Sequence, residues 1–503
     1  MILIGTSSCT SWLDLRPEGE MVLDEYWQTE SEAEAVMAAC YRALIEKDCT
    51  TRMLAWGELR SDNVVEGNNI LYEVTQTLKQ EIEPTNVFSK WNSFYTIINY
   101  CNTFIKYAPT VLDADDNFTV EKLRAMEAEV YTIRSLAYFY LVRAFGNVPW
   151  ITTPSIDDTQ NYIVPQSTER VVLDSIIKDL NYAALYAKNQ HSTLQHTKGR
   201  ITKNAVHALL ADIYLWDNQY DKCIKECDKI ISDPNLTLVR AENMLYSVFY
   251  KGNSTESIFE LQFDDDVQVN SVTRDYYGYS GNIYGNVSYP PVLVEGQYSP
   301  FKYPVGSGLI ESAQDYRVKD FIVNIKTIGI YFIFKYAGMD RTESSTSTTS
   351  SYSYRSNTSN WIVYRLTDIY LMKAEALIQR DGDAGMISAI SMVNKSYIRS
   401  NPDADTLNVG LYTGVADVEK LVLRERQREL MFEGKRWFDL MRIARREGSP
   451  VPLISYIGKT TSNSKALSKI SSLDALYWPV NKTEMEANKL LKQNPFYNTN
   501  SNN

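Results

Sequence analysis

The most distinctive stretch of this sequence lies in its C-terminal half and reads Arg424-Glu425-Arg426-Gln427-Arg428-Glu429-Leu430-Met431-Phe432-Glu433-Gly434-Lys435-Arg436-Trp437-Phe438-Asp439-Leu440-Met441-Arg442. Charged residues recur in it at steps of three and four, a spacing suited to ion pairs along a helix: Glu425, Arg428, Glu429, Glu433 and Arg436. Large apolar residues between them supply a packing face. We therefore expect these charges to be structural, and a catalytic role for Glu429 or Glu433 is the less favoured alternative.

Helical patterns extend from this segment toward the N-terminus. Lys203 to Trp216 and Tyr220 to Ile231 are two such patterns, joined by the short polar turn Asp217-Asn218-Gln219. Together they look like a tetratricopeptide unit, whose helix pairs stack because one pair cannot bury its apolar face alone. Four more patterns predict helices, the last two as a second unit: Glu127 to Phe145, Glu169 to Ala187, Trp361 to Arg380 and Ala384 to Arg399. A mostly helical protein is predicted.

The composition indicates an acidic protein with a substantial core. The chain has 503 residues, 44% of them hydrophobic, and its 62 acidic against 51 basic side chains give a net charge of −11. This hydrophobic content excludes wholesale disorder. A negative charge without a long basic cluster argues against nucleic-acid binding. No long uninterrupted apolar run occurs, so we expect no membrane-spanning helix.

The residue composition and the apolar periodicity change between the two helical halves. Ile258 to Phe263 alternates like a strand, and Asp264-Asp265-Asp266 follows it. We interpret the three aspartates as a solvated turn, with a cation site as the alternative. From Tyr276 to Tyr303, 7 of 28 residues are Tyr, interrupted by Gly and Pro, which predicts loops. Thr342 to Asn360 holds 13 Ser or Thr in 19 residues, a composition typical of a flexible exposed segment.

Residue types that often carry chemistry form no recognisable site. Cysteine occurs 6 times without repeated spacing, and Cys223 and Cys227 lack the further ligands of a zinc site. We expect buried, apolar roles for them. Gly458-Lys459-Thr460 is not a phosphate-binding loop, because Leu453 stands where its first glycine belongs. The sequence thus predicts no catalytic residue, no metal and no cofactor.

The first cysteine has a separate interpretation. Cys9 follows Met1-Ile2-Leu3-Ile4-Gly5-Thr6-Ser7-Ser8, which is apolar and then small. This resembles the end of a bacterial lipoprotein signal, where the cysteine thiol takes the lipid. The alternative is an ordinary N-terminus.

Several motifs together resemble the SusD/RagB family of outer-membrane lipoproteins. The C-terminal ones are Ile362 to Leu377, Val393-Asn394 and Arg424 to Arg442. The N-terminal half agrees, with Cys9, Trp12-Leu13-Asp14-Leu15, Tyr26-Trp27, Glu30, Ala39, Tyr41, and the Arg134 helix running into Phe145-Gly146-Asn147-Val148-Pro149. The resemblance covers nearly the whole chain.

This resemblance implies a mostly α-helical scaffold of about four tetratricopeptide-like helix pairs, with long loops and a few short strands. It implies a non-enzymatic protein, attached by lipid to the outer membrane and exposed at the cell surface. Such a protein would capture an oligo- or polysaccharide and deliver it to a SusC-like TonB-dependent transporter. The alternatives are a peptide-capturing, RagB-like binding protein and, if an unnoticed carboxylate pair converges, a hydrolase.

The resemblance and the changes in residue composition along the chain suggest how the chain is divided. Residues 1–9 form a lipoprotein signal remnant, 10–257 the N-terminal helical half, 258–360 a loop-rich insert and 361–503 the C-terminal helical half. We expect these parts to form one integrated globular unit, with the insert as the candidate ligand surface.

Sugar recognition requires aromatic rings that stack on apolar CH faces and polar side chains that bind hydroxyl groups. The tyrosine-rich region supplies the candidates Tyr276, Tyr277, Tyr279, Tyr284 and Tyr289. The segment from Trp56 to Tyr72, where family members often place binding residues, supplies Trp56, Arg60, Asp62, Asn68, Asn69 and Tyr72. The alternative is that these aromatics complete the scaffold or face the transporter.

Overall fold

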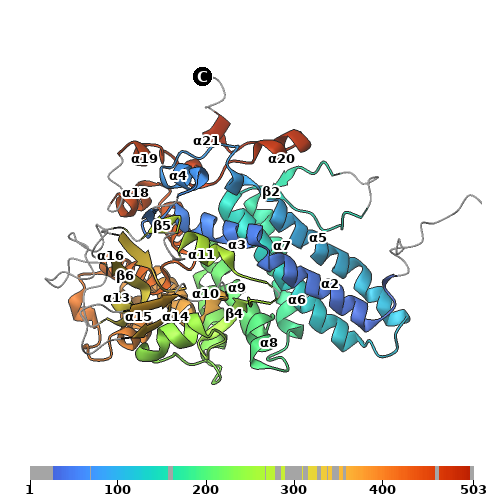
Figure 1. Cartoon of the computed structure of the whole chain (residues 1–503), viewed down its shortest axis with the longest axis horizontal. Coiled ribbons are helices and arrows are strands. Elements are labelled where there is room, and N and C mark those ends of the chain that lie inside the picture. The colour runs from blue at the N-terminus through green and yellow to red at the C-terminus, as the bar shows by residue number, and fades with distance from the viewer. Residues whose placement is uncertain are drawn as a thin grey trace, which may run out of the picture.

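Stacked helix pairs build the scaffold of the protein (Figure 1). The computed structural model describes residues 26–67, 70–156, 162–266, 268–277, 285–288, 290, 309, 315–325, 330–336, 338–342, 351–354, 358–458 and 464–498. Four pairs pack in the described part of the chain: α2 (Glu30–Ile45) with α5 (Asn92–Tyr107), α6 (Val120–Phe145) with α7 (Glu169–Tyr186), α9 (Lys203–Trp216) with α10 (Tyr220–Ile231), and α14 (Leu366–Asp381) with α15 (Met386–Ser400). Successive pairs touch through α5 and α6, α7 and α9, and α10 and α14. The predicted mostly helical fold is confirmed.

Local signals fix the ends of these helices. The Thr202 hydroxyl accepts a hydrogen bond from the Ala205 N–H and begins α9. Gly146, at φ +73°, ends α6, because a glycine adopts this left-handed conformation without steric cost. Every residue of α9 from Ala205 to Trp216 is buried. This helix therefore lies in the middle of the core.

Shorter helices complete the fold. They are α3 (Lys47–Leu54), α4 (Tyr72–Leu78), α8 (Leu194–Gly199), α11 (Ser271–Tyr276), α13 (Tyr316–Phe321), α16 (Val415–Leu430), α17 (Arg436–Arg446), α18 (Val451–Ile457), α19 (Ser464–Ser468), α20 (Lys482–Ala487) and α21 (Pro495–Asn498). In Figure 1, α4, α18, α19, α20 and α21 lie together along one edge of the molecule. C-terminal segments thus meet an early helix of the chain there.

The described strands form two-stranded antiparallel sheets. They pair β1 (Val65–Glu66) with β5 (Val287–Ser288), β2 (Val148–Pro149) with β3 (Gln166–Ser167), β4 (Ser257–Leu261) with β10 (Trp361–Arg365), β6 (Ile322–Ile325) with β7 (Ile330–Ile333), and β8 (Gly338–Thr342) with β9 (Ser351–Tyr354). The strand expected near Ile258 is therefore present as β4. Two of these sheets, β1 with β5 and β4 with β10, join segments that are distant in the sequence.

Two expectations need correction. The helix expected from Trp361 begins only at Leu366, because the preceding five residues are buried and pair with β4 as β10. A short run that is apolar on both faces fits either a buried strand or a buried helix. The segment from Thr342 to Asn360 is not exposed throughout. Ser351–Tyr354 pairs with β8, and Ser359 and Asn360 are buried, while residues 343–350 and 355–357 lie outside the described part.

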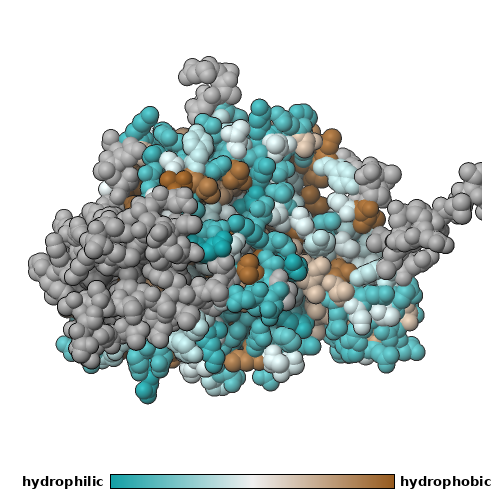
Figure 2. Space-filling view, in the orientation of Figure 1, coloured by the Kyte–Doolittle hydropathy of each residue, from teal (hydrophilic) through white to brown (hydrophobic). Residues whose placement is uncertain are grey.

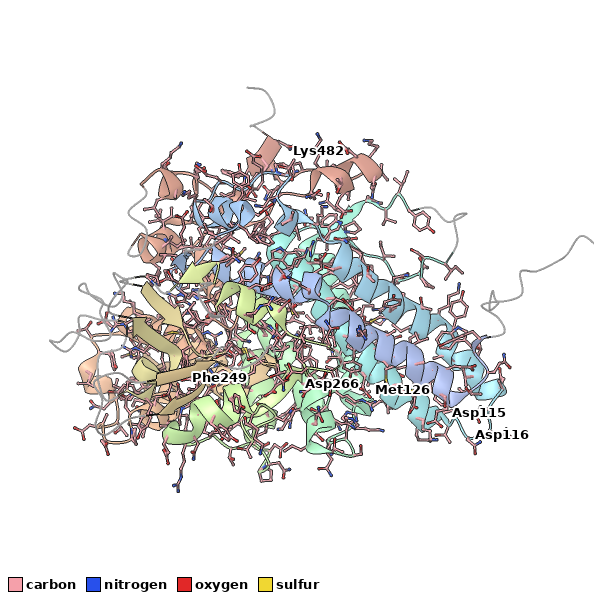
Figure 3. All side chains as sticks on the ribbon, in the orientation of Figure 1. Asp115, Asp116, Met126, Phe249, Asp266 and Lys482 are labelled. Atoms are coloured by element: carbon pink, nitrogen blue, oxygen red, sulfur yellow. The ribbon has the colours of Figure 1, made fainter. Side chains whose placement is uncertain are left out.

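Two other predictions, an exposed acidic turn and buried cysteines, are confirmed for the described residues. The acidic turn after β4 is exposed, and Figure 3 labels its Asp266. The described cysteines are all buried: Cys40, Cys49, Cys101, Cys223 and Cys227. Over the ranges given above, no helix has both the length and the apolar character needed to cross a bilayer. The face in Figure 2 is largely hydrophilic, and its apolar residues gather in small groups.

Candidate functional site

The two segments singled out for ligand binding are joined in the structure. β1, from the first segment, pairs with β5, from the tyrosine-rich region, with Val65 opposite Ser288 and Glu66 opposite Val287. The two strands are separated by more than 200 positions in the chain, so sequence spacing alone gives no hint of this contact. The described parts of the two segments therefore meet at β1 and β5.

Asn286 holds this junction together. Its side-chain oxygen accepts the Leu71 N–H at 2.8 Å, and its side-chain nitrogen donates to the Asp275 carbonyl at 2.8 Å. The Gly67 N–H donates to the Asn286 carbonyl at 2.9 Å. A Cβ atom at Gly67 would lie 2.2 Å from the Gly285 carbonyl oxygen, so only glycine permits this approach. Both residues were missed by the sequence analysis, since neither differs locally from an ordinary loop residue.

Tyr72 presents its side chain to solvent beside the junction. It begins α4, which packs against β1, and it is 71% exposed. Its ring borders a cavity of about 520 Å³. The opposite wall comes from the C-terminal part of the chain, through Lys469 and Phe496. These two wall residues could not be inferred from sequence, because they lie about 400 positions from α4.

The cavity is polar around this ring. Gln76 donates from its side chain to the Tyr72 hydroxyl at 3.1 Å. Glu81 and Lys469 form an ion pair of 2.6 Å across the wall, and the hydrogen bond from Lys469 lowers the pKa of the Glu81 carboxyl. The site thus combines an exposed aromatic face with amide and paired charged groups. We call Tyr72, Gln76, Glu81, Lys469 and Phe496 the Tyr72 site.

Three other candidates from the first segment are buried. The Trp56 indole nitrogen donates to the Phe88 carbonyl at 2.8 Å. The guanidinium of Arg60 donates to the carbonyl oxygens of Leu476 and Ala475, both at 2.7 Å, and lies 4.2 Å from the Trp437 ring centroid.

Asp62 is paired with Arg436 at 2.7 Å and is also buried. The expectation of a solvent-facing role therefore fails for Trp56, Arg60 and Asp62. The reason is that the scaffold itself uses their hydrogen bonds.

Tyr276 and Tyr277 are also in the interior. They lie at the end of α11 instead of in a loop, and Tyr277 is only 1% exposed. Its ring is nearly parallel to that of Tyr336, with centroids 6.5 Å apart. Burial raises the pKa of both hydroxyls. Composition predicted exposed loops here because it cannot register that α11 folds back onto the core.

The remaining candidates lie outside the described residues: Tyr279, Tyr284, Tyr289, Asn68, Asn69 and the proposed lipid attachment residue Cys9. Tyr72 is thus the candidate that the structure places on the surface beside a cavity.

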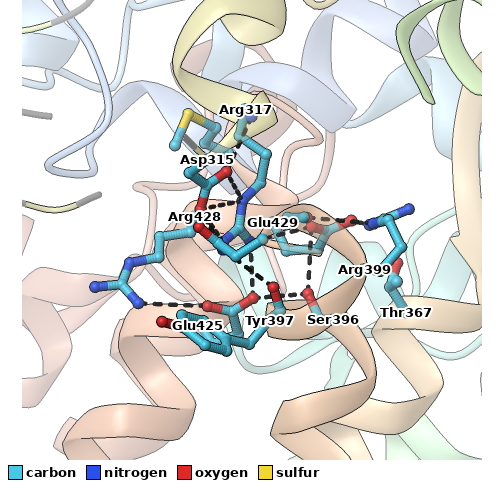
Figure 4. A network of polar contacts seen from close by, with 12 residues as sticks. Asp315, Arg317, Thr367, Ser396, Tyr397, Arg399, Glu425, Arg428 and Glu429 are labelled. Carbon is cyan, nitrogen blue, oxygen red and sulfur yellow. Dashed lines mark hydrogen bonds and ion pairs between the residues drawn. The ribbon is translucent and has the colours of Figure 1, made fainter. Parts of the chain in front are cut away.

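Several charged residues of the distinctive C-terminal stretch belong to a buried network of ion pairs, part of which Figure 4 shows. Arg365 pairs with Glu256 at 2.7 Å and with Glu429 at 2.6 Å. Arg317 pairs with Glu425 at 2.7 Å. We call the following residues the buried ionic cluster, in which cations and anions are equal in number: Arg317, Lys335, Arg365, Arg399, Arg428, Asp315, Glu256, Glu425, Glu429 and Glu433.

This arrangement corrects the expected pairing along a single helix. α16 ends at Leu430, so Glu433 and Arg436 lie beyond it. Most partners come from other elements, and the contact between Arg428 and Glu425 at 3.5 Å is a local exception. The cluster instead fastens Arg317 and Lys335 to α16.

Electrostatics keep two of the four glutamates of the cluster, Glu429 and Glu433, ionised. Burial by itself raises the pKa of Glu429, but Arg399, Arg365 and Arg317 outweigh it and hold the pKa well below its ordinary value. The pKa of Glu433 is lowered in the same way by Arg365 and Lys335. Both side chains are fully buried and paired, which is the arrangement expected for structural carboxylates. No group of His, Cys, Asp or Glu suited to a metal ion occurs among the residues described.

Comparisons with known proteins agree with this architecture. Residues 319–497 match the family model described as SusD family, and residues 11–215 match the one described as starch-binding associating with outer membrane. SusD-like protein P38 of Formosa agariphila is 26% identical over 87% of this chain and 88% of its own length. A SusD-like protein of Bacteroides ovatus is 28% identical over 43% of this chain and 38% of its own.

Solved structures share the fold. A SusD superfamily protein from Bacteroides vulgatus superposes with a TM-score of 0.74 at 18% identity, over 94% of this chain and all of its own. Another protein of that organism, described as a sugar binding protein, has a TM-score of 0.72 at 20% identity, over 94% of this chain and 99% of its own. The class is therefore a scaffold of stacked helix pairs with the SusD-like fold. The chain belongs to the SusD-like family.

Proposed function

We propose that this protein captures a glycan at the cell surface and delivers it to a SusC-like TonB-dependent transporter in the outer membrane. The Tyr72 site carries the glycan part of this proposal. An exposed tyrosine ring borders a cavity of about 520 Å³ whose other groups include an amide and an ion pair. Apolar ring faces of a sugar stack on such an aromatic, and its hydroxyl groups bind the polar side chains.

The relatives support the choice of ligand class. One matching family model is described as starch-binding, and one protein of the same fold is described as a sugar binding protein. The same family description refers to association with the outer membrane, which supports the proposed location. Soluble starch is therefore the first probe to use.

Affinity gel electrophoresis tests the site directly. Gels containing soluble starch, or another polysaccharide from a plant, algal and bacterial panel, should retard the unmodified protein. Tyr72→Ala should abolish most of this retardation, because the stacking face is lost. Tyr246→Ala is the matched control, since Tyr246 is 56% exposed and does not line the cavity.

Two results would contradict the proposal. Equal retardation of Tyr72→Ala and unmodified protein would move the ligand elsewhere. A protein that no polysaccharide retards, but that binds peptides from a digest, would favour the peptide-capturing alternative.

We propose that binding occurs without chemistry. The carboxylates of the distinctive stretch are buried in ion pairs, so they cannot reach a bound chain in this conformation. Incubation with the retained polysaccharide should release no reducing ends. Release that disappears when one carboxylate is replaced would identify a hydrolase instead.

The proposed anchor and partner have their own tests. Cys9→Ser in a chain with its complete signal should move the protein from the membrane fraction to the soluble fraction. Affinity purification of the unmodified protein from outer membranes should recover a TonB-dependent transporter. Unchanged fractionation would contradict lipid attachment, and recovery without any transporter would contradict the delivery role.

A further inference from the structure

A second and larger cavity lies next to the Tyr72 site. Its volume is about 880 Å³, and it opens between the end of α6, the start of α7 and the C-terminal segment. The two cavities share this segment as a dividing wall. Phe496 and Tyr497 line the first cavity, while Asn494, Pro495 and Asn498 line the second.

The dividing wall is narrow. It is α21, which has 4 residues and lies between α4 and α19 on one side and α20 and β2 on the other (Figure 1). A helix with its side chains is about 10 Å across. A chain of linked sugars can cross such a ridge, whereas a single sugar cannot occupy both cavities.

The second cavity contains polar groups with unused hydrogen-bonding capacity. The side-chain oxygen of Asn147 accepts the Glu169 N–H at 3.0 Å, but its side-chain nitrogen donates to no described residue. The Asp474 carboxylate and the Lys492 ammonium group likewise form no hydrogen bond or ion pair within the described part of the chain. These groups offer two donors and one acceptor to a ligand.

An apolar surface adjoins these groups. Leu490 lines the cavity and is 50% exposed, and Tyr477 borders it beside Asp474. The Tyr497 hydroxyl donates to the Tyr477 carbonyl at 3.2 Å, which fixes the wall between the cavities. Apolar surface next to a carboxylate, an amide and an ammonium group suits a neutral polyhydroxylated ring.

We infer that the second cavity is a subsite for the same glycan, so that the ligand is an oligosaccharide chain that crosses α21 and occupies both cavities. This inference rests on the proposed function. It adds a second binding surface and a preference for longer chains, because a chain that fills both cavities binds more tightly than a fragment that fills only the Tyr72 site.

The test is a glycan array with plant, algal and bacterial oligosaccharides of graded chain length. The variant combines Asp474→Ala with Lys492→Ala, whose side chains hold no described part of the fold. The control combines Asp403→Ala with Lys251→Ala, which removes the same charges from exposed positions elsewhere. The unmodified protein should bind long chains roughly tenfold more tightly than short ones of the same sugar.

In the variant that combines Asp474→Ala with Lys492→Ala, the difference in affinity between long and short chains should shrink to about threefold or less. Binding of short chains should be retained. An unchanged length dependence would overturn the inference and leave the proposed function intact. Equal weakening at every length would also overturn it, because the groups would then belong to one undivided site. Failure of the unmodified protein to bind any glycan would overturn the proposed function together with the inference.

Discussion

The buried ionic cluster and the Tyr72 site are opposites in both sequence and structure. The cluster contains the most recognisable residues of the chain, and every one of its charges has a partner in the interior. The Tyr72 site is assembled from distant segments, and its aromatic ring faces solvent. The difference indicates that the distinctive C-terminal stretch maintains the scaffold, while the proposed ligand site is formed by less distinctive residues at its edge.

The largest expected effect comes from breaking the cluster. Arg365→Ala leaves Glu256, Glu429 and Glu433 without a shared buried cation. Removing one partner of a buried ion pair costs about 3–5 kcal/mol of unfolding free energy. Urea denaturation should show a loss of this size, or the variant should fail to accumulate. Arg240→Ala, at an exposed arginine, is the control, and a loss below about 1 kcal/mol in Arg365→Ala would contradict the structural role.

Acid should weaken a second group of buried ion pairs, in which Asp368 contacts Arg426 and Lys435. Burial raises the pKa of Asp368, but Lys435 and Arg426 outweigh it and hold the pKa well below its ordinary value of 3.8. A carboxyl with a lowered pKa in the folded state contributes stability above its unfolded pKa and loses it as the pH falls further. The urea midpoint should therefore decline as the pH falls below about 4. Asp368→Asn should flatten this decline, and an equally steep one would contradict the assignment.

Loss of the close contact at Gly67 should have an intermediate effect. Gly67→Ala places a methyl group against the Gly285 carbonyl and should push β1 away from β5. Overpacking of this kind costs about 1–3 kcal/mol. Gly414→Ala is the control, because open space surrounds that position. If Gly67→Ala matched the control in stability and in retention by polysaccharide gels, the junction would not support the site.

The smallest expected effect concerns the ion pair in the cavity wall. Lys469→Met removes the partner of Glu81, but both side chains are about one-third exposed. Exposed pairs of this kind contribute about 0–1 kcal/mol to stability. Denaturation curves should therefore be nearly unchanged, while retention in the gels decreases. A loss of unfolding free energy comparable to that of Arg365→Ala would contradict the distinction between the buried ionic cluster and the Tyr72 site.

These contrasts show which features were readable from sequence. α9 and α10 were predicted with their observed bounds, because apolar periodicity and a polar turn are local signals. β10 was mistaken for helix, since a run such as Trp361–Arg365 has no distinguishing period. The burial of Tyr276 and Tyr277 was missed for a related reason, namely that composition does not register tertiary packing.

The candidate site was only partly predictable. Tyr72 was selected from its segment, but Lys469 and Phe496 are brought to it by the fold and carry no local signal. The long-range partners of Glu425 and Glu429 were missed likewise, because spacing along one helix cannot reveal Arg317 or Arg365. The sequence therefore identified the family and the scaffold better than the proposed ligand site.

The most direct test of the comparison is hydrogen–deuterium exchange of the unmodified protein with and without the retained polysaccharide, beginning with soluble starch. We expect slower exchange in α4 and around Lys469, and unchanged exchange in α16, which carries Glu425 and Glu429. Protection confined to α16 and its neighbours, with none in α4, would contradict it.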